Sequence, residues 1–400
     1  MYADRVLSGM RPTGRLHIGH YHGALRNWVR LQDEYQCLYF VADWHALTTH
    51  YEEPETVADT AWEMVIDWLG AGIDPFRSTI FIQSRVPQHA ELTLLLGMMT
   101  PVGWLERVPT YKDQQQSLAG RDLSTFGFLG YPLMQGADIL IYRANLVPVG
   151  EDQVSHLELV RELARRFNHL YGREPGFEDK AREAVGRLGG RRARRYEELR
   201  TAYQQQGDAE ALAEAKTLLE RADNLAAADR ERLFGYLEGT RRVILPEPQA
   251  LLTETPKVPG LDGRKMSKSY GNAIFLREDP AEVTRKIRTM QTDPARVRRV
   301  DPGNPERCPV WGLHQIYSDP PTREWVWQGC TTAGIGCLEC KQPVIDAVLR
   351  EQAPMRERAQ PYVDDPQLVR RIVAEGCERA RTLAEETMRD VREAMGLRYE

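Results

Sequence analysis

Two histidines three positions apart are the first residues whose type and spacing suggest chemistry. His17 and His20 lie in the glycine-rich segment "PTGRLHIGHYHGAL", residues 12–25. Neutral imidazoles donate hydrogen bonds to phosphate oxygens without carrying a permanent charge. Glycines let a ligand approach the backbone, and a strand-to-helix turn presents N–H groups to an anion. The pattern favours phosphate chemistry, whereas a single histidine there would more often be structural.

A second segment, "GRKMSKSYGN" at residues 263–272, carries two lysines between glycines. Lys265 and Lys268 flank Met266 and Ser267 in what we expect to be a flexible loop. Such a loop can close over a triphosphate and neutralise the charge that develops on leaving pyrophosphate. Two lysines in a loop are by themselves usually solvated, so the prediction depends on both segments occurring in one chain.

Four of the six cysteines form a third group of candidate ligands, with the spacing C-x21-C-x6-C-x2-C: Cys308, Cys330, Cys337 and Cys340. Four thiolates suit a tetrahedral Zn²⁺ or an iron–sulfur cluster. We expect a cytosolic chain with reduced thiols, so a metal site is a better interpretation than a disulfide framework. Cys37 and Cys377 are typical of small buried apolar residues.

Composition restricts the class of protein that positions these groups. The 400 residues are 42% hydrophobic and 28% charged, with a net charge of -5. This charge excludes a uniformly basic nucleic-acid coat but not local basic patches. No apolar run approaches the roughly 20 residues that cross a bilayer, and the first residues do not resemble a signal peptide. The sequence therefore predicts a cytoplasmic protein that does not bind membranes.

Strand-like and helix-like stretches alternate over the first 170 residues or so. Strands are predicted at "DRVLSGM", "CLYFVADW", "STIFIQS" and "ADILIY", and helices start near Tyr21, Val57 (ending at Gly70) and Gly150. This βαβ pattern predicts an α/β fold with a Rossmann-like parallel sheet, whose ligands lie at the carboxyl ends of the strands.

The chain is predicted to contain four segments. Residues 1–175 and 243–280 are expected to form a Rossmann-like catalytic domain, interrupted by a helical insertion at 176–242. Residues 281–400 are expected to be an all-α domain that holds the four cysteines. An arginine run in the insertion can meet RNA phosphates or form a solvated helix face: Arg187, Arg191, Arg192, Arg194 and Arg195.

The segments "HIGH" at 17–20 and "KMSKS" at 265–269 resemble the signature pair of class I aminoacyl-tRNA synthetases. Within that class, "FVADWHALTTHY", "GWLERVPTYKDQ" and "VPVGEDQVSHLELVRELARRFN" are similar to tryptophanyl-tRNA synthetases. The resemblance implies activation of L-tryptophan by ATP, with Mg²⁺ on the phosphates, and transfer to tRNA(Trp). It also implies a homodimer, and it implies that the helical domain at 281–400 binds the tRNA anticodon. The cysteine spacing resembles a subgroup that carries a [4Fe–4S] cluster, with Zn²⁺ as the alternative.

The resemblance also implies roles for individual residues. The catalytic set is His17, His20, Lys265 and Lys268. ATP is expected to contact Met10, Arg11, Thr13, Gly19, His20, Gly150, Asp152, Lys265, Met266, Ser267 and Lys268. Tryptophan is expected to contact Leu7, His45, Tyr131, Gln135, Asp138 and Gln153, with Asp138 accepting the indole N–H.

Two other functions stay open at this stage. The spacing of Tyr131, Gln135 and Asp138 also fits the way tyrosyl-tRNA synthetases hold tyrosine, which makes that enzyme the alternative within the class. A synthetase-like protein that binds tryptophan or a partner without charging tRNA is the alternative of another class.

Overall fold

The computed structural model describes residues 4–108, 124–150, 154–172, 176–239, 243–252 and 258–398. The chain forms two compact units, each assembled from separate stretches of sequence. Unit 1 comprises Met1–Ser8, Gln83–Leu252 and Cys377–Glu400, and unit 2 comprises Gly9–Ile82 and Thr253–Gly376. Within the described chain, no helix is long and apolar enough to span a membrane.

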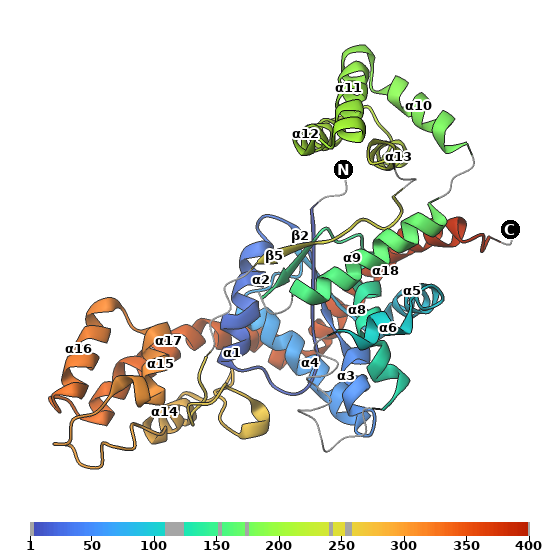
Figure 1. Cartoon of the computed structure of the whole chain (residues 1–400). Coiled ribbons are helices and arrows are strands. Elements are labelled where there is room, and N and C mark those ends of the chain that lie inside the picture. Colours follow the sequence, from blue (N-terminus) through green and yellow to red (C-terminus); the bar gives the residue numbers. More distant parts are fainter. Residues whose placement is uncertain are drawn as a thin grey trace. The chain divides into compact units, whose positions relative to one another are not determined.

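A five-stranded sheet has the strand order β3-β2-β1-β4-β5 (Figure 1). Its strands are β1 (Arg5–Met10), β2 (Gln36–Val41), β3 (Ser78–Ile82), β4 (Leu146–Val149) and β5 (Gln249–Leu252). The β2–β3, β1–β4 and β4–β5 pairs are parallel. β2 and β3 are almost entirely buried, as their unbroken apolar runs predict for strands covered on both faces. The predicted α/β, Rossmann-like parallel-sheet fold is confirmed, although β5, within the Pro-rich "LPEPQALLTETPKVPG", was not predicted.

One predicted strand is wrong. The run "ADILIY" belongs to α8 (Phe126–Ile141), which begins at Thr125, whose hydroxyl accepts a hydrogen bond from the N–H of Phe128. The helix packs against α5 (Gln88–Gly97) and α9 (Val154–Tyr171), so its last turns are buried all round. An apolar run of this length is compatible with a buried strand or a buried helix, and tertiary packing decides between them.

In unit 2, α4 (Pro54–Ala71) connects β2 to β3 and packs against α17 (Cys337–Asp364). The predicted stop at Gly70 is wrong, because the helix continues to Ala71 and is capped by Gly72 with φ of 116°. Gly70 serves the packing instead, since a Cβ there would lie 2.9 Å from the carbonyl oxygen of Met355. Around the amino-terminal half of α17 lie α14 (Pro280–Thr289), α15 (Pro309–Tyr317) and α16 (Pro320–Thr331) (Figure 1).

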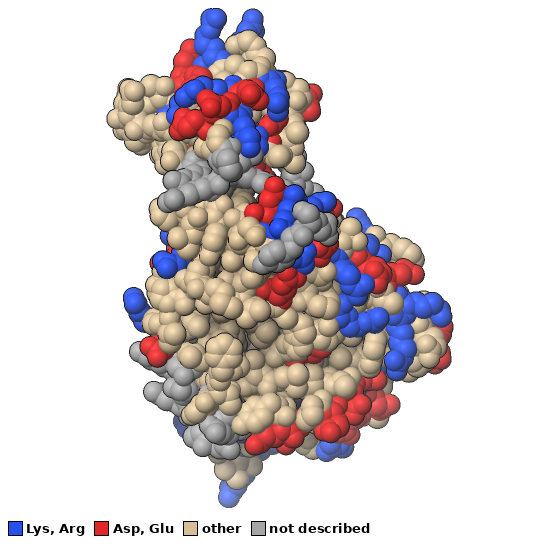
Figure 2. Space-filling model, turned by 90° about the vertical axis from the view of Figure 1, so that its right-hand side faces the viewer, with Lys and Arg blue, Asp and Glu red and all other residues tan. Residues whose placement is uncertain are grey.

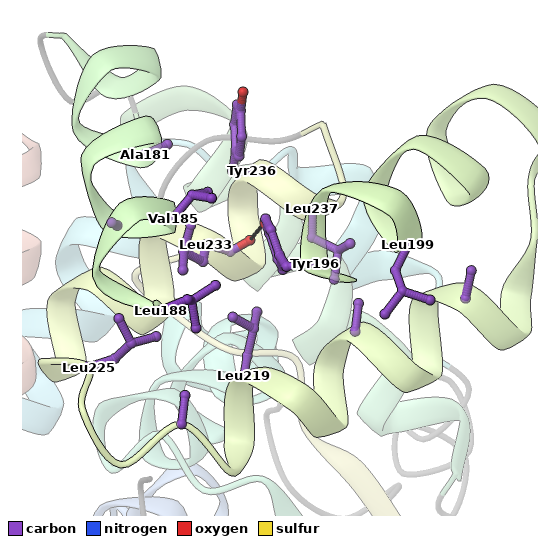
Figure 3. Close-up of a cluster of buried hydrophobic side chains, with 14 residues drawn as sticks. Ala181, Val185, Leu188, Tyr196, Leu199, Leu219, Leu225, Leu233, Tyr236 and Leu237 are labelled. Carbon is purple, nitrogen blue, oxygen red and sulfur yellow. Dashed lines mark hydrogen bonds between the residues drawn. The ribbon is translucent and has the colours of Figure 1, made fainter. Parts of the chain in front are cut away.

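Four helices of unit 1 form a bundle with its own core: α10 (Phe177–Arg187), α11 (Gly190–Gln206), α12 (Ala209–Glu220) and α13 (Ala227–Leu237). Apolar side chains from all four point inward, and the buried Tyr196 hydroxyl donates to the Leu233 carbonyl at 2.7 Å (Figure 3). The bundle therefore has an apolar core of its own.

The surface of this bundle carries mixed charge rather than a single positive patch. Figure 2 shows blue and red side chains interspersed over it. Three arginines of the run pair with carboxylates: Arg187 with Asp229, Arg192 with Asp223 at 3.3 Å, and Arg195 with Glu214 at 2.7 Å. These contacts favour the solvated, ion-paired helix face over the RNA-phosphate interpretation of the run.

The remaining elements are shorter, apart from the last helix, which contributes residues to both units. In unit 2 they are α1 (Ile18–His20), the π-helical turn η1 (Tyr21–Leu25), α2 (Arg26–Leu31), α3 (Asp43–His50), the 3₁₀ turns η4 (Lys268–Tyr270) and η5 (Pro305–Arg307). Unit 1 adds the 3₁₀ turn η2 (Gln83–Arg85) and α6 (Val102–Glu106), and the chain ends in α18 (Pro366–Ala394).

Candidate functional site

The two motif segments pair with each other through the backbone in unit 2. The Ile18 N–H donates to the Ile274 carbonyl at 3.0 Å, and the Leu276 N–H donates to the Leu16 carbonyl at 3.0 Å. These bonds flank an antiparallel bridge between His17 and Phe275. The backbone that follows the lysine loop is therefore fixed beside the histidine segment, although the two are far apart in sequence.

A lysine contact joins the two loops directly. Lys268 Nζ donates to the Gly14 carbonyl at 2.7 Å. Gly14 has φ of 109°, a conformation that side-chain-bearing residues rarely adopt, which explains the glycine. At Gly19 a Cβ would lie 2.9 Å from the His17 ring and 3.8 Å from Met266 Cβ. The glycines thus make room for the close approach of both loops.

Both histidines are neutral at physiological pH. Burial, followed by the charges of Lys268 and Lys265, lowers the pKa of His17 to about 4. Burial, followed by His17 and the same lysines, lowers the pKa of His20 to about 3. His20 Nδ1 accepts a hydrogen bond from the His17 N–H at 3.2 Å, which assigns the ring proton to Nε2. His20 can therefore donate from Nε2 to a phosphate oxygen without carrying charge.

His17 contributes a second polar atom to the same place. Its imidazole is 7% exposed and its ring lies 3.8 Å, centroid to centroid, from that of His20. His17 Nδ1 is buried and has no hydrogen-bond partner among the described residues. An unpartnered buried polar atom carries a free-energy penalty, which a ligand group bound there would relieve.

Two residues that sequence reasoning missed hold these loops in place. The Asn272 Oδ1 accepts from the Ser267 N–H at 2.8 Å, and Asn272 Nδ2 donates to Asp262 Oδ1 at 2.7 Å. The Asp67 carboxylate accepts from the Leu16 N–H at 3.1 Å and pairs with Arg277. Asn272 ends the quoted lysine segment, so its position was a signal, whereas nothing in the sequence marks Asp67.

The other residues predicted to bind ATP have varied settings. Met10 ends β1 and is half-buried, whereas Arg11, Thr13 and Lys265 are exposed. Ser267 is half-buried, and Met266 is 4% exposed. Gly150 directly follows β4 in unit 1, and Asp152 lies outside the described residues. In unit 2 the structure thus brings together His17, Gly19, His20, Met266 and Lys268, the last with a pKa that burial lowers to about 8.

Asp138 lies in a buried polar network of unit 1. Gln83 Nε2 lies 2.9 Å from each carboxylate oxygen of Asp138, and His89 Nδ1 lies 2.6 Å from Oδ1. His89 Nε2 lies 2.7 Å from the Tyr142 hydroxyl. Asp138 is 1% exposed and the other three are fully buried. Sequence reasoning singled out Asp138 but missed its partners Gln83 and His89, and it missed Tyr142, which contacts His89.

The other residues predicted to bind tryptophan are distributed over several elements. Tyr131 and Gln135 share a face of α8 with Asp138, at i, i+4 and i+7, and both are half-buried. Leu7 lies in β1 and is 1% exposed. His45 lies in α3 and is half-buried. Gln153 lies outside the described residues.

The four predicted metal ligands gather at helix ends in unit 2. Cys308 precedes α15, Cys330 lies in the last turn of α16, and Cys337 and Cys340 lie one turn apart at the start of α17. All are free thiols. Burial, followed by the other three cysteines, raises the pKa of the Cys340 thiol to about 12. Four thiols close enough to influence one another's ionisation, three of them at helix amino termini, are a suitable donor set for a cationic centre.

The surroundings of these thiols add buried positive charge. Burial raises the pKa of the Cys330 thiol, and the charge of Arg296, which is 9% exposed, opposes that rise. Arg296 Nε has no hydrogen-bond partner among the described residues. Lys341 is 3% exposed and donates to the Arg288 and Met290 carbonyls. Among the described residues no three His, Cys, Asp or Glu side chains converge as ligands of one metal ion. The donor chemistry therefore fits a thiolate-bound centre, but the side chains do not form a closed single-ion site.

Comparison with known proteins defines the class. The family model described as "tRNA synthetases class I (W and Y)" matches residues 3–182 and 218–350. The chain therefore belongs to the class I aminoacyl-tRNA synthetases, in the family of the tryptophan and tyrosine enzymes, as the paired motifs predicted.

Within this family the chain belongs to the tryptophan–tRNA ligases, as the sequence resemblance predicted. The chain is 69% identical over 399 residues to the tryptophan–tRNA ligase of Ralstonia nicotianae, covering 100% of both chains. It is 45% identical over 397 residues to that of Thermotoga maritima, covering 99% of this chain and 100% of the other. A crystal structure of Campylobacter jejuni tryptophanyl-tRNA synthetase with ADP and tryptophan matches with a TM-score of 0.72 and 26% sequence identity. The match covers 98% of this chain and 99% of the Campylobacter chain.

Proposed function

We propose that the chain activates L-tryptophan with ATP at the two paired motif loops and transfers the tryptophanyl group to tRNA(Trp). The observation that carries the proposal is the pairing of the two motif loops, with Lys268 hydrogen-bonded to the Gly14 carbonyl beside His17 and His20. The full-length similarity to tryptophan–tRNA ligases supports the choice of amino acid.

Adenylate formation requires no covalent bond to the protein, because both reacting groups belong to the substrates. The tryptophan carboxylate is the nucleophile, the α-phosphorus of ATP is attacked, and pyrophosphate leaves. Neutral His17 and His20 donate to phosphate oxygens, while Lys265 and Lys268 neutralise the charge that develops on pyrophosphate. When bound, Mg²⁺ would be coordinated mainly by the ATP phosphates, with few protein ligands. Met10, Arg11, Thr13, Gly19, Gly150, Asp152, Met266 and Ser267 complete the proposed ATP contacts.

Selection of tryptophan rests on Asp138, whose carboxylate accepts the indole N–H. A buried site that hydrogen-bonds a substrate donor rejects an analogue without that donor by roughly 10⁴ to 10⁵. Tyr131 and Gln135, on the same face of α8, are further proposed contacts, and Leu7, His45 and Gln153 complete the set that the sequence resemblance implies.

Tryptophan-dependent exchange of labelled pyrophosphate into ATP tests the proposal. Exchange with tryptophan, none with tyrosine, and charging of tRNA(Trp) are the expected results. Exchange with tyrosine alone would identify the tyrosyl enzyme, and no exchange from folded protein would overturn the enzyme assignment. A Lys268→Met variant should bind tryptophan normally but lose most exchange, because it removes the ammonium and nothing from unit 1.

We propose that Cys308, Cys330, Cys337 and Cys340 hold a [4Fe–4S] cluster rather than zinc. A tetrahedral zinc requires all four sulfurs at about 2.3 Å from one point, whereas each iron of a four-iron cluster takes one cysteine. The cysteine spacing, which resembles the subgroup that carries the cluster, supports this choice, and the four cysteines lie at the ends of α15, α16 and α17. When bound, the centre would supply structural cross-linking of α15, α16 and α17.

Metal analysis distinguishes the occupants. Protein purified without oxygen should be brown, with about four irons and four sulfides per chain. About one zinc in colourless protein would replace the cluster by a structural zinc. Neither metal would leave four reduced thiols and end the metal proposal, while the synthetase function would stand.

The proposed enzyme works as a homodimer in the cytoplasm. Analytical sedimentation tests the dimer, and cell fractionation tests the localisation.

The proposed domains have separate roles. The segment 281–400 binds the tRNA anticodon, and the segments 1–175 and 243–280 form the catalytic domain around the insertion at 176–242. A truncation lacking 281–400 is the wrong test, because α17 packs against α4 and its removal would expose the core of unit 2. Surface substitutions on α14 to α16, assayed for tRNA KM, are the suitable measurement.

A further inference from the structure

Asp138, His89 and Tyr142 form a chain of two hydrogen bonds between α8 and α5, here called the relay. Asp138 and Tyr142 lie one turn apart at the end of α8, and His89 lies in the first turn of α5. One imidazole spans both, with Nδ1 at 2.6 Å from Asp138 Oδ1 and Nε2 at 2.7 Å from the Tyr142 hydroxyl. None of the three is more than 1% exposed.

The direction of each hydrogen bond follows from chemistry. An ionised carboxylate only accepts, so His89 Nδ1 carries a proton and donates to Asp138. In the neutral imidazole Nε2 is then the acceptor, and the Tyr142 hydroxyl donates to it. Burial, followed by the charge of Asp138, raises the pKa of Tyr142 well above its ordinary value, so this hydroxyl keeps its proton. Tyr142 thereby fixes the tautomer that His89 presents to Asp138.

Gln83 shows how strongly the network favours the carboxylate. Its amide nitrogen donates to both oxygens of Asp138 at 2.9 Å. This orientation leaves Gln83 Oε1 buried without a hydrogen-bond partner among the described residues. Flipping the amide would turn an acceptor toward an acceptor-only group, which is worse. The surrounding donors therefore define one orientation of the carboxylate plane.

We propose that His89, oriented by Tyr142, is the positioning residue that holds the Asp138 carboxylate for the indole N–H and so sets selectivity for tryptophan. This inference rests on the proposed role of Asp138 in binding tryptophan. His89 does not touch the substrate in this scheme. It acts by keeping a buried carboxylate ionised and in one rotamer, because removing its donor leaves part of that charge uncompensated.

Two amide substitutions at His89 separate its two hydrogen bonds. The asparagine amide nitrogen takes the place of Nδ1, so His89→Asn keeps the donor to Asp138 and loses contact with Tyr142. The glutamine side chain reaches the place of Nε2, where its amide oxygen accepts from the Tyr142 hydroxyl, so His89→Gln keeps the contact with Tyr142 and loses the donor to Asp138. Both remove the ring, so they are matched in the packing that they lose.

The assay is pyrophosphate exchange with tryptophan and with β-(3-benzothienyl)alanine, in which sulfur replaces the indole N–H. The measured quantity is the ratio of kcat/KM for the two amino acids. His89→Gln should lower this ratio at least ~10-fold through the KM for tryptophan, and His89→Asn should stay within ~3-fold of the parent ratio. Tyr142→Phe should lower it by ~2- to 5-fold. Tyr196→Phe, which removes a buried tyrosine hydroxyl bond in the helical bundle, should leave it unchanged.

The outcomes separate this inference from the proposed function. If the parent enzyme shows no tryptophan exchange, the proposed function fails. If Asp138→Asn leaves the ratio unchanged, the assigned role of Asp138 fails and the inference with it. If Asp138→Asn lowers the ratio but the two His89 variants behave alike, or lose activity equally with both amino acids, His89 is only structural and the inference alone is overturned. Should His89→Gln not fold, an unchanged ratio in Tyr142→Phe would overturn the relay.

Discussion

The charge of Lys268 should control ATP capture over an accessible pH range. Burial lowers the pKa of Lys268 from 10.5 to about 8, against the opposing effect of Asp67. A lowered lysine pKa means that the ammonium is present below that pH and is lost as the pH rises through it. With a pKa of about 8, the charged fraction falls from about nine-tenths at pH 7 to about one-tenth at pH 9. If only the ammonium form captures ATP, kcat/KM for ATP should fall about tenfold over this range.

The histidines do not contribute to this change. The pKa values of His17 and His20, lowered to about 4 and 3, keep both rings neutral throughout the range. Bound triphosphate restores the lysine pKa by its negative charge, so kcat should change less than kcat/KM. The assay is pyrophosphate exchange at saturating tryptophan with ATP varied from pH 6.5 to 10.

A Lys268→Arg variant is the matched control. Its guanidinium stays charged at every pH used, while titration of ATP, tryptophan and the rest of the protein is shared with the parent. The parent profile divided by the variant profile should therefore isolate the lysine and bend near pH 8. A ratio that stays flat up to pH 10 would refute both the lowered pKa and the role of the ammonium in ATP capture.

Three further changes test other parts of the structure. Gly19→Ala places a Cβ 2.9 Å from the His17 ring, so it should lower pyrophosphate exchange at least ~10-fold with an unchanged melting temperature. Gly23→Ala is its control and should leave exchange intact, because nothing lies within 4 Å of the added Cβ. Equal exchange in the two variants would contradict the packing argument. Cys337→Ser should raise the KM for tRNA while sparing tryptophan activation, and equal loss of both would count against an RNA-ordering role. Asp67→Asn breaks a buried ion pair and should lower the free energy of unfolding by about 3 kcal/mol, measured in urea; a change below ~1 kcal/mol would show that the pair contributes little.

Local sequence predicted those parts of the fold in which the residue pattern is compatible with only one type of secondary structure. Unbroken apolar runs marked β2 and β3, because a strand covered on both faces has no polar side. The run at 137–142 was ambiguous, since a helix buried all round is equally apolar, and packing of α8 between α5 and α9 made it helical. The sequence did not predict β5, because its four residues lie in a proline-rich stretch and form a strand only by pairing with β4.

The same division applies to the site. Residue type and spacing by themselves predicted phosphate chemistry at the histidine and lysine segments, because neutral imidazoles, ammonium groups and glycines together suit the binding of a phosphate. They also indicated the four cysteines as candidate ligands. Only the tertiary structure decided that Lys268 reaches the Gly14 carbonyl, which depends on backbone pairing between distant segments. Only tertiary structure, likewise, assigned His89 and Tyr142 to Asp138, because a buried carboxylate takes its donors from whichever helices pack around it.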